Sequence, residues 1–287
     1  MPRIAYVNGR YVAHADASVH IEDRGYQFAD GVYEVCEVAR GFIVDMPRHL
    51  GRLNRSLSEL SIDWPVTQAV LPLILREVVR RNHVVDGLVY VQVTRGVASR
   101  DFVFPAPGTR SALVVTARKA DPAAAVKRAE TGIKVITVPE NRWDRVDIKS
   151  TGLLPNVLAK QKAKEAGAQE AWFVDTDGMV TEGGSSNAWI VTRDGALVTR
   201  PAEHGILRGI TRTTLFDVAA KLGLTIEERK FSVTEAKAAR EAFISSATTI
   251  AMPIVAIDGA PVANGHPGSV TLSLRQAFFD VAEKSPA

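Results

Sequence analysis

Turn signals between strand-like runs recur along the chain, and they restrict its fold more than any other feature. The dipeptide Asn8-Gly9 separates two short runs rich in β-branched and aromatic residues, which is the strongest short-range signal for a β-hairpin. Arg40-Gly41 separates strands expected over 31–39 and 42–45 in the same way. The pattern returns in the second half at Asp177-Gly178, Asp194-Gly195 and Asp258-Gly259. Strands joined by tight turns are antiparallel, so their clustering favours an α+β fold over strict alternation of strands and helices.

Four longer elements are expected in the rest of the first half: helices over 47–60 and 66–82, and strands over 88–94 and 112–117. Leucines at helical spacing define the first helix, and Pro72 is expected to kink or restart the second. Between the two strands, residues 95–110 form a long loop with glycine and proline, a kind of loop that often carries function. In the strand over 31–39, Tyr33 points to the face opposite that of Glu34, because side chains alternate along a strand.

The second half mixes strands and helices. It is expected to begin with a meander of four strands over 171–175, 179–181, 188–191 and 196–199. The meander is followed by a helix over 211–222 that ends at Gly223, a strand over 225–231, a short helix over 233–239, a strand over 242–246 and a final helix over 269–284. A linker at residues 121–126 is expected to join a smaller N-terminal α/β domain, residues 1–120, to a larger C-terminal domain, residues 127–287.

The composition is that of an ordinary soluble globular enzyme, with 46% hydrophobic and 23% charged residues among 287. The pI is near 9.0, but the net charge is only +3 and charges of both signs are interspersed, so no nucleic-acid surface is expected. No signal peptide, membrane span or metal site is expected either. The single cysteine, Cys36, excludes an internal disulfide and fits a reducing compartment, which makes the cytoplasm the expected location.

Lys149 stands apart from the three lysines that follow it, which fall inside a helix expected over 155–167. It lies before that helix and after the apolar segment 133–139, with small residues beside it. A lysine at a strand end in a crowded polar loop can be desolvated and have its pKa lowered, as a Schiff-base lysine requires. A plain surface lysine is the alternative for this residue taken alone.

Three further stretches are polar, rich in small residues and placed near the ends of strands or helices. Residues 181–187 place Glu182 beside two glycines and two serines, which indicates a tight turn with hydroxyls around a fixed acid, or a solvated surface turn. Residues 205–213 place Gly209 before a helix whose first turn can bind an anion, or is an ordinary capped helix start. Residues 245–249 lie at the end of a strand and carry several hydroxyls. These hydroxyls can bind the same anion, or the segment is only a polar exit from the strand into a loop.

Together these stretches predict a site for pyridoxal phosphate. The phosphate needs amides and an arginine, for which Arg52 is available, and the aldehyde needs Lys149. A carboxylate, Glu182, would keep the pyridine nitrogen protonated. The chain has no Walker loop, and no Gly-x-Gly-x-x-Gly opens a helix after a strand, so a nucleotide site is the weaker interpretation.

Several motifs in the same order resemble the class IV, or fold-type IV, pyridoxal-phosphate-dependent aminotransferases. They lie at 25–34, 49–53, 147–150, 156–161, 181–187 and 205–212, and the similarity spans nearly the whole chain. Within that family the chain is most similar to the D-amino-acid (D-alanine) aminotransferases, through its length and through residues 94–96 and 142–149. The resemblance implies a two-domain fold in which the larger C-terminal domain binds the cofactor on an antiparallel-rich, barrel-like sheet.

The resemblance also implies roles for individual residues. Lys149 would form the internal aldimine and move the proton between substrate and cofactor, and Glu182 would pair with the pyridine nitrogen. Leu207 would pack against the ring. The phosphate would be bound by Arg52, Gly209, Ile210, Thr211, Ser246, Ala247 and Thr248. The substrate would be contacted by Tyr33, Arg100, Phe102 and Ser185.

Two residues depart from the pattern of the family. Phe102 stands where D-specific members carry a histidine, so Arg100 is left with fewer partners for binding the substrate carboxylate. Ala247 stands where members often carry a threonine, and Thr248 can supply the hydroxyl instead. The resemblance further implies a homodimer, in which the loop that carries Arg100 contributes across the interface.

The implied reaction moves an amino group from a D-amino acid such as D-alanine to a 2-oxo acid such as 2-oxoglutarate through a 1,3-proton shift. Branched-chain L-amino-acid aminotransferase, (R)-amine transaminase and aminodeoxychorismate lyase stay open as alternatives with the same cofactor. A cofactor-binding homologue without turnover is disfavoured because both Lys149 and Glu182 are present. A nucleic-acid binder is disfavoured because the sequence has no aromatic-basic patch.

Overall fold

The structure, a computed structural model, describes residues 3–203 and 205–287 of the chain. The chain divides into two compact units. Unit 1 comprises Met1–Asp121, Ile148–Gly152 and Glu283–Ala287, and unit 2 comprises Pro122–Asp147 and Leu153–Ala282. The chain therefore leaves unit 2 after Asp147, adds a short segment to unit 1, and then returns to unit 2.

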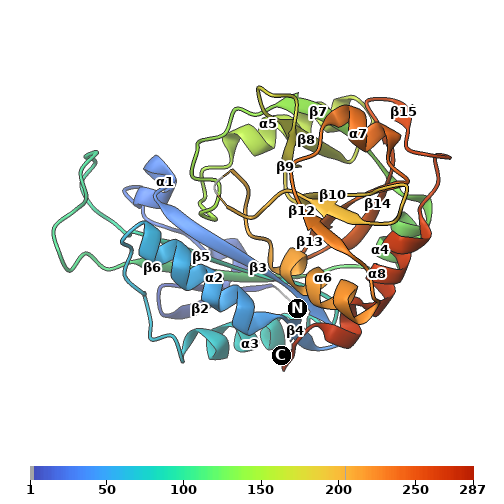
Figure 1. Cartoon of the computed structure of the whole chain (residues 1–287). Coiled ribbons are helices and arrows are strands. Elements are labelled where there is room, and N and C mark those ends of the chain that lie inside the picture. The colour runs from blue at the N-terminus through green and yellow to red at the C-terminus, as the bar shows by residue number, and fades with distance from the viewer. Residues whose placement is uncertain (1–2, 204) are drawn as a thin grey trace. The chain divides into compact units, whose positions relative to one another are not determined.

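Unit 1 is built on an antiparallel sheet in the order β16-β4-β3-β5-β6-β1-β2 (Figure 1). Its strands are β1 (Ile4–Val7), β2 (Arg10–Ala13), β3 (Gly31–Ala39), β4 (Phe42–Val44), β5 (Gly87–Thr94), β6 (Ala112–Lys119) and β16 (Lys284–Pro286). The pairing of β1 with β2 and of β3 with β4 confirms both hairpins expected here. Asn8 and Gly9 adopt φ of 47° and 96°, a left-handed conformation that these two residue types reach at low cost. β16 is too short and polar to be visible in the sequence pattern.

Alternation along β3 separates two kinds of side chain. Val32, Glu34 and Cys36 are buried, whereas Tyr33 and Val35 on the opposite face are half-buried, as the period of a strand predicts. β3 pairs with β5 along nearly its whole length. One face of this sheet therefore belongs to the core of unit 1, and the other leaves Tyr33 partly accessible.

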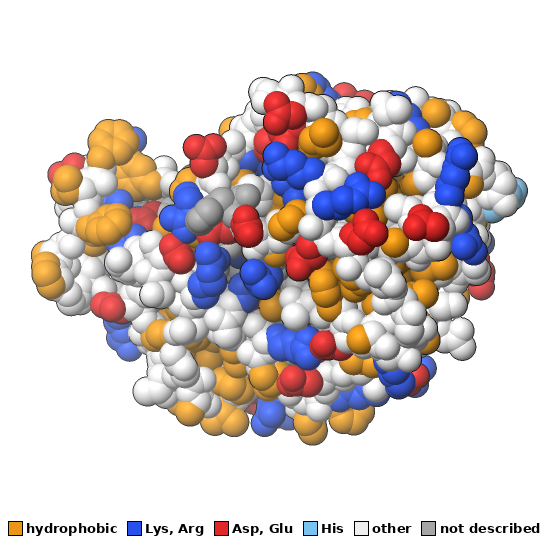
Figure 2. All heavy atoms as spheres, viewed as in Figure 1, with side chains coloured by type: hydrophobic (Ala, Val, Ile, Leu, Met, Phe, Trp, Pro, Cys, Tyr) orange, Lys and Arg blue, Asp and Glu red, His pale blue; other side chains and the backbone are white. Residues whose placement is uncertain are grey.

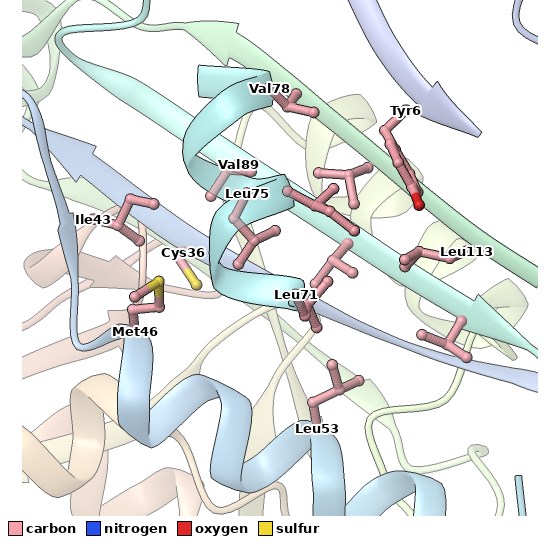
Figure 3. Close-up of a cluster of buried hydrophobic side chains, with 14 of the residues drawn as sticks. Tyr6, Cys36, Ile43, Met46, Leu53, Leu71, Leu75, Val78, Val89 and Leu113 are labelled. Carbon is pink, nitrogen blue, oxygen red and sulfur yellow. The ribbon is translucent and has the colours of Figure 1, made fainter. Parts of the chain in front are cut away.

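Two helices, α2 (Met46–Glu59) and α3 (Leu71–Arg81), cover the buried face of the sheet. Figure 3 shows Leu53 of α2 and Leu75 of α3 in one cluster with Cys36 of β3. The side chains of all three are at most 1% exposed. Removal of this much apolar surface from water is the dominant favourable contribution to folding.

α3 begins at Leu71, so the expected start at residue 66 and the alternative of a kink at Pro72 are wrong, whereas the alternative of a restart at Pro72 agrees with where the helix begins. Pro72 lies in the first turn of the helix. The missing N–H of a proline costs little there, because the first N–H groups of a helix have no partner within it. The proline therefore starts the helix. Two short helices, η1 (His14–Asp16) and α1 (Arg24–Phe28), precede β3.

Unit 2 is built on a mixed sheet in the order β12-β11-β10-β13-β14-β7-β8-β9, with β15 paired to β14. Its strands are β7 (Ile133–Pro139), β8 (Glu170–Val174), β9 (Val180–Gly183), β10 (Asn187–Val191), β11 (Leu197–Thr199), β12 (Ile226–Glu228), β13 (Glu241–Ser246), β14 (Ile250–Ile257) and β15 (Ala260–Pro261). Parallel pairs, such as β7 with β8 and β14 with β7, stand among antiparallel ones. The combination of hairpins and mixed pairing confirms the α+β class.

The meander of four successive strands expected in this half is wrong. β8 pairs with β9, and β10 pairs with β11, but the other neighbour of β10 is β13. β9 therefore lies at one end of the sheet order, although only the turn over 184–186 separates it from β10 in the sequence. β10 is buried throughout, and β13 over all but its last residue, so burial rather than closeness in sequence selects this pairing.

The helices of unit 2 are α4 (Pro122–Thr131), α5 (Leu154–Glu165), α6 (Ile210–Lys221), α7 (Val233–Ala238) and α8 (Ser269–Val281). α6 and α8 lie side by side at the lower right of Figure 1. α8 ends before the expected residue 284, because the chain passes into unit 1 as β16. The linker expected at 121–126 stays a prediction. Within 3–203 and 205–287, no helix combines the length and the apolar character that a membrane crossing requires.

Leu75→Ala is expected to lower the free energy of unfolding by about 2–5 kcal/mol, since it leaves a cavity in the core of unit 1. Leu73 lies on the same helix but is 59% exposed, which makes Leu73→Ala the matched control, with an expected change within about 0.5 kcal/mol. Urea unfolding of the three proteins measures both values. Equal losses for the two variants would contradict the packing of α3 on the sheet.

Candidate active site

Lys149 belongs to unit 1 through the segment Ile148–Gly152, whose first residue is buried in the core of that unit. Main-chain hydrogen bonds fix the segment beside β3. The N–H of Tyr33 donates to the carbonyl of Lys149 at 3.0 Å, and the N–H of Thr151 donates to the carbonyl of Gly31 at 3.0 Å. The backbone of the lysine is therefore as firmly placed as a residue in a sheet.

The side chain of Lys149 lies against the ring of Tyr33. Its Nζ is 4.4 Å from the centroid of the Tyr33 ring, within the range of a cation–π contact. Tyr33 stacks on Tyr90 with centroids 5.6 Å apart, and the hydroxyl of Tyr90 donates to Oε1 of Gln92 at 2.6 Å. Burial, with a smaller contribution from Tyr33, raises the pKa of Tyr90 to about 12. The ring of Tyr33, stacked on that of Tyr90, therefore lies on one side of the Lys149 amine.

A buried carboxylate fixes the arginine that was expected to bind phosphate. Glu34 accepts from Nε of Arg52 at 2.6 Å and from its Nη2 at 2.8 Å, and its Oε2 lies 2.7 Å from Nδ1 of His49. Burial acts to raise the pKa of Glu34, but the charge and hydrogen bonds of Arg52, with those of His49, hold that pKa well below its usual range. The orientation of the Arg52 guanidinium is therefore fixed by a residue of β3 as well as by α2, the helix that carries Arg52.

Arg100 lies in the loop between β5 and β6, among aromatic rings. Its guanidinium carbon is 5.1 Å from the centroid of Phe28 and 5.7 Å from that of Phe102. Nη1 of Arg24 donates to the carbonyl of Asp101 at 2.7 Å, which ties this part of the loop to α1. The Phe102 side chain is 80% exposed. The loop therefore places the guanidinium of Arg100 next to the aromatic side chains of Phe28 and Phe102.

In unit 2, the carboxylate of Glu182 is held by three donors from different parts of the chain. Oε1 accepts from Nη1 of Arg142 at 2.6 Å, and Oε2 accepts from Nδ2 of Asn187 and from the N–H of Leu207, both at 3.1 Å. The side chains of Glu182 and Arg142 are each 6% exposed. Their separation and burial make this a charge-assisted contact in a low-dielectric setting. The carboxylate is therefore oriented from several sides.

The two serines of the turn over 184–186 do not surround Glu182, contrary to expectation. The hydroxyls of Ser185 and Ser186 donate to Oε2 of Glu170 at 3.0 and 3.1 Å, and Oε1 of the same carboxylate lies 3.1 Å from Nζ of Lys160. Glu170, on β8, thus anchors the turn. The sequence pattern correctly places hydroxyls around an acid but names the wrong acid.

The start of α6 can accept an anion. Gly209 is its N-cap, in an extended conformation and without a side chain to cap the first turn. A Cβ added to Gly209 would lie 2.0 Å from Oδ1 of Asn187, so the backbone approaches that side chain as only glycine allows. Ile210 and Thr211 form the buried first turn, and main-chain N–H groups at such a turn favour phosphate.

The turn after β13 offers further hydroxyls. Oγ of Ser246 and Oγ1 of Thr249 lie 2.8 Å apart, and Ala247 and Thr248 lie between these residues. Nη1 of Arg275 donates to the carbonyls of Thr249 and Ala251, on either side of Ile250. Ile250 has φ of 55°, a conformation that costs a β-branched residue energy. The arginine of α8 therefore secures a strained turn.

The residues present fit pyridoxal phosphate. Unit 1 supplies an amine on a fixed backbone, Lys149, and unit 2 supplies a buried, oriented carboxylate, Glu182, together with an uncapped helix start. These are the donor types that the aldehyde, the ring nitrogen and the phosphate require. In the part of the chain that the structure describes, no group of three His, Cys, Asp or Glu side chains is placed to hold a metal ion.

The structure divides the expected site residues between the units. Unit 1 holds Tyr33, Arg52, Arg100, Phe102 and Lys149, and unit 2 holds Glu182, Ser185, Leu207, Gly209, Ile210, Thr211, Ser246, Ala247 and Thr248. Sequence reasoning assigned no role to the partners that orient these groups, Glu34, His49, Arg142 and Asn187. The one available signal was helical spacing, which puts His49 and Arg52 on one face of α2.

Comparison with known proteins identifies relatives along the whole chain. Residues 31–257 match the family described as amino-transferase class IV. The D-alanine aminotransferase of Bacillus licheniformis is 40% identical over 271 residues, which cover 94% of each chain. Among solved structures, the branched-chain amino acid aminotransferase of Escherichia coli superposes with a TM-score of 0.91 at 25% identity, covering 98% of this chain and 95% of that one. A second branched-chain amino acid aminotransferase, in a structure with pyridoxamine 5'-phosphate, gives a TM-score of 0.89 at 25% identity, covering 98% and 94%. The expected fold type is therefore confirmed.

Glu34→Gln is expected to lower the free energy of unfolding at neutral pH by about 3–5 kcal/mol, because it breaks a buried ion pair by removing the carboxylate to which Arg52 donates. The folded-state pKa of Glu34 lies below the unfolded value, so its contribution is complete above an unfolded pKa of about 4.3 and is lost progressively as the pH falls from there toward the folded-state pKa. Urea unfolding over a pH series should therefore show the wild type losing stability below about pH 5 more steeply than the variant.

Glu77→Gln is the matched control for this measurement. Hydrogen bonds from Arg80 and Arg81 lower the pKa of Glu77 to about 2, but this ion pair is at the surface, where water and salt screen it. The control should therefore change stability at neutral pH far less than Glu34→Gln. Losses of similar size in the two variants would show that burial does not set the strength of the Glu34 contacts.

Proposed function

Because the chain belongs to the class IV aminotransferases, we propose that it moves an amino group from a D-amino acid such as D-alanine to a 2-oxo acid such as 2-oxoglutarate, with pyridoxal phosphate as cofactor. The observation that carries the proposal is the identity of 40% to a D-alanine aminotransferase along 94% of both chains. The branched-chain enzyme of Escherichia coli shares the fold at only 25% identity, which makes an L-specific activity the second candidate.

Lys149 has two tasks in this proposal. Pyridoxal phosphate, when bound, supplies an aldehyde and a ring that accepts electron density. The amine of Lys149 would hold the aldehyde, and as a free amine it would take the proton from the α-carbon of the substrate. The ring of Tyr33, 4.4 Å from Nζ, limits the directions that the amine can take. A positioned base of this kind contributes typically ~10²–10⁴-fold to the rate.

Unit 2 holds the ring and most of the phosphate contacts in this proposal. The carboxylate of Glu182 keeps the proton on the ring nitrogen, and Leu207, whose N–H orients that carboxylate, packs its side chain against the ring. The phosphate is assigned to Arg52, Gly209, Ile210, Thr211, Ser246, Ala247 and Thr248. The uncapped start of α6 and the hydroxyl pair after β13 support this assignment, since phosphate takes both kinds of donor.

The substrate carboxylate is assigned to Arg100, with Tyr33, Phe102 and Ser185 around the substrate. Arg100 lies beside two phenyl rings, those of Phe28 and Phe102, and a guanidinium binds a carboxylate through two parallel hydrogen bonds. Since the ring of Phe102 cannot donate as a histidine does, Arg100 supplies the donors at this point of the loop. Phe102 also offers apolar surface to the substrate, so aromatic amines of the (R) series belong in any substrate panel.

We also propose a homodimer, in which the loop carrying Arg100 reaches the site of the partner. Both units expose apolar side chains that a monomer rarely leaves in water. On α5, Leu154, Val157 and Leu158 are 69%, 59% and 54% exposed, at a spacing that puts them on one face. In the loop, Phe102 and Phe104 are 80% and 62% exposed, and Figure 2 shows hydrophobic side chains gathered over this loop at the left of the view.

The state of the single cysteine supports an assignment to the cytoplasm. Cys36 is free and buried, and burial raises the pKa of its thiol well above the usual value. A thiol in this state reacts slowly with oxidants, because the thiolate is the reactive form. A chain with a single cysteine cannot form an internal disulfide, so an oxidising compartment would not stabilise it in that way.

The purified protein is expected to be yellow and to lose that absorbance when D-alanine is added, but not with L-leucine. With 2-oxoglutarate as acceptor, turnover should follow the same preference, and (R)-1-phenylethylamine tests the alternative that Phe102 suggests. Lys149→Ala should reduce turnover by at least ~10²–10⁴-fold, the contribution of a positioned base. Faster bleaching by L-leucine than by D-alanine would replace the proposed function with the branched-chain activity.

Lys162→Ala is the matched control for the lysine variant. Lys162 lies on α5 and is exposed, so its replacement should leave both the absorbance and the turnover unchanged. Borohydride reduction of the coloured protein, followed by peptide mapping, should place the cofactor on Lys149 alone. Attachment at any other lysine would contradict the assignment of the site.

Light scattering after gel filtration should give the mass of a dimer for the wild type. Replacing Leu154 and Leu158 by serine should shift the protein toward the monomer, because it removes apolar area from the proposed interface. Val126→Ser, on an exposed position of α4, is the control. Mixing Arg100→Ala with Lys149→Ala should restore activity that neither variant has alone, if the loop serves the site of the partner. A dimer without such complementation would confine Arg100 to its own subunit.

A further inference from the structure

Asp30, the residue before β3, accepts hydrogen bonds from two arginines. Its Oδ2 accepts from Nε of Arg24 at 2.8 Å and from Nε of Arg95 at 2.7 Å, and its Oδ1 accepts from Nη2 of Arg95 at 3.0 Å. The side chains of Arg24, Arg95 and Asp30 are 5%, 9% and 12% exposed. Hydrogen bonds between ionised groups that are shielded from water are stronger than neutral ones, so Asp30 fixes both guanidinium groups.

Arg24 connects this carboxylate to the residue that follows Arg100. Nη1 of Arg24 donates to the carbonyl of Asp101 at 2.7 Å, and its guanidinium carbon lies 4.9 Å from the centroid of the Phe28 ring. The guanidinium carbon of Arg100 lies 5.1 Å from the same centroid, and the ring of Phe102 lies 5.6 Å from it. Arg24 therefore holds the main chain next to Arg100 and also contacts the ring beside which Arg100 lies.

Arg95 fixes a second point of the same loop. Its guanidinium carbon lies 3.7 Å from the centroid of the Phe104 ring, which is a close cation–π contact. Its Nη1 and Nη2 also donate to the carbonyls of Ser61 and Leu60, at 2.9 and 2.7 Å. The group on which Phe104 packs is therefore anchored both to Asp30 and to the segment that follows α2.

The loop over 95–110 is closed at its base but exposed where it carries Arg100. Gly96 has φ of 94°, and a Cβ added to it would lie 2.0 Å from the carbonyl oxygen of Arg110, so the two ends of the loop approach each other as only glycine allows. Residues 99–104 are all exposed. This stretch is not held by burial in the core, so its shape depends on specific tethers such as those from Arg24 and Arg95.

We propose that Asp30 is a positioning residue for substrate binding, because through Arg24 and Arg95 it holds the loop in the shape that presents Arg100 to the substrate carboxylate. This inference rests on the proposed function, since it takes Arg100 as the group that binds that carboxylate. A guanidinium binds a carboxylate in one planar, bidentate geometry, so a small displacement of the loop loses one of two hydrogen bonds. Asp30 acts on the strength of substrate binding and not on proton transfer.

The test compares Asp30→Asn with the wild type in the reaction of the coloured holoenzyme with D-alanine alone, followed through the loss of absorbance. Burial acts to raise the pKa of Asp30, but the hydrogen bonds and charges of Arg95 and Arg24 hold that pKa below its usual value, so the substitution removes a charge at neutral pH. The D-alanine concentration that gives half the maximal rate should rise by roughly 10- to 100-fold, the cost of a misplaced binding group.

The maximal rate itself should stay close to that of the wild type, because the tether acts on the substrate carboxylate and not on the α-carbon. A general disturbance of the fold would lower the maximal rate instead. A lowered maximal rate with an unchanged half-maximal concentration would therefore overturn the inference.

A double-variant cycle separates action through Arg100 from a broader effect. Arg100→Ala should raise the half-maximal concentration of D-alanine, and Asp30→Asn added to it should raise that concentration little further, since residues that act as a unit are not additive. Effects that multiply would overturn the inference. Trypsin supplies a readout without substrate, because the native Asp30→Asn protein should be cut after Arg100 faster than the wild type. An unchanged rate of cleavage would contradict the tether.

Asp175→Asn is the control, because Asp175 forms a comparably buried ion pair with Arg200 in unit 2, at 2.9 Å and with side chains 18% and 13% exposed. It should change neither the half-maximal concentration of D-alanine nor the cleavage by trypsin. If Asp30→Asn does not fold, Arg24→Gln decides, since it removes the donation to the main chain of the loop and leaves Arg95 paired with Asp30.

The outcomes distinguish the inference from the function on which it rests. An unchanged half-maximal concentration in Asp30→Asn, or in Arg24→Gln where that variant decides, would overturn the inference while leaving the proposed function intact. An unchanged concentration in Arg100→Ala would overturn the assignment of Arg100 to the substrate carboxylate, and the inference with it.

Discussion

Main-chain hydrogen bonds to β3 hold the segment Ile148–Gly152 in unit 1, although the residues on both sides of it belong to unit 2. The side chain of Lys149 therefore starts from a backbone fixed by β3, beside the ring of Tyr33. A flexible lysine side chain loses much conformational entropy when it is ordered. Because the backbone of Lys149 is already fixed, fewer conformations are open to the side chain before it is ordered. The placement of one amine thus depends on a strand that lies far earlier in the sequence.

Each unit pairs buried charged side chains within itself. In unit 1, Glu34 joins Arg52 to His49, and in unit 2, Arg142 joins Glu140 to Glu182. Because a buried charge without a partner is costly, each of these groups keeps its orientation when the unit folds. Electrostatic preorganisation of this kind is a large part of how enzymes lower barriers, since no reorganisation is needed at the moment of reaction.

Local elements could be predicted from the sequence, and long-range partners could not. Asn8-Gly9 determines a hairpin by its own backbone preferences, and side-chain alternation along β3 separates Tyr33 from Glu34 without further information. The neighbour of β10 is β13, however, and the acid that accepts from Ser185 and Ser186 is Glu170. Such pairings depend on which surfaces come together when the chain collapses, and the spacing of residues in the sequence does not predict them. Pro72 is an intermediate case, because a proline limits a helix but does not say whether it begins or bends one.

The solitary thiol in the core of unit 1 makes the chain convenient to probe. Cys36 is 1% exposed, between β3 and the helices that cover it (Figure 3). A reagent in solvent reaches it only when this core opens, so the rate of thiol modification under native conditions reports the opening of unit 1 separately from that of unit 2. Conversely, a cysteine introduced on the surface carries a fluorophore or spin label with little background from the native one. Few chains of this size allow both measurements without prior removal of other cysteines.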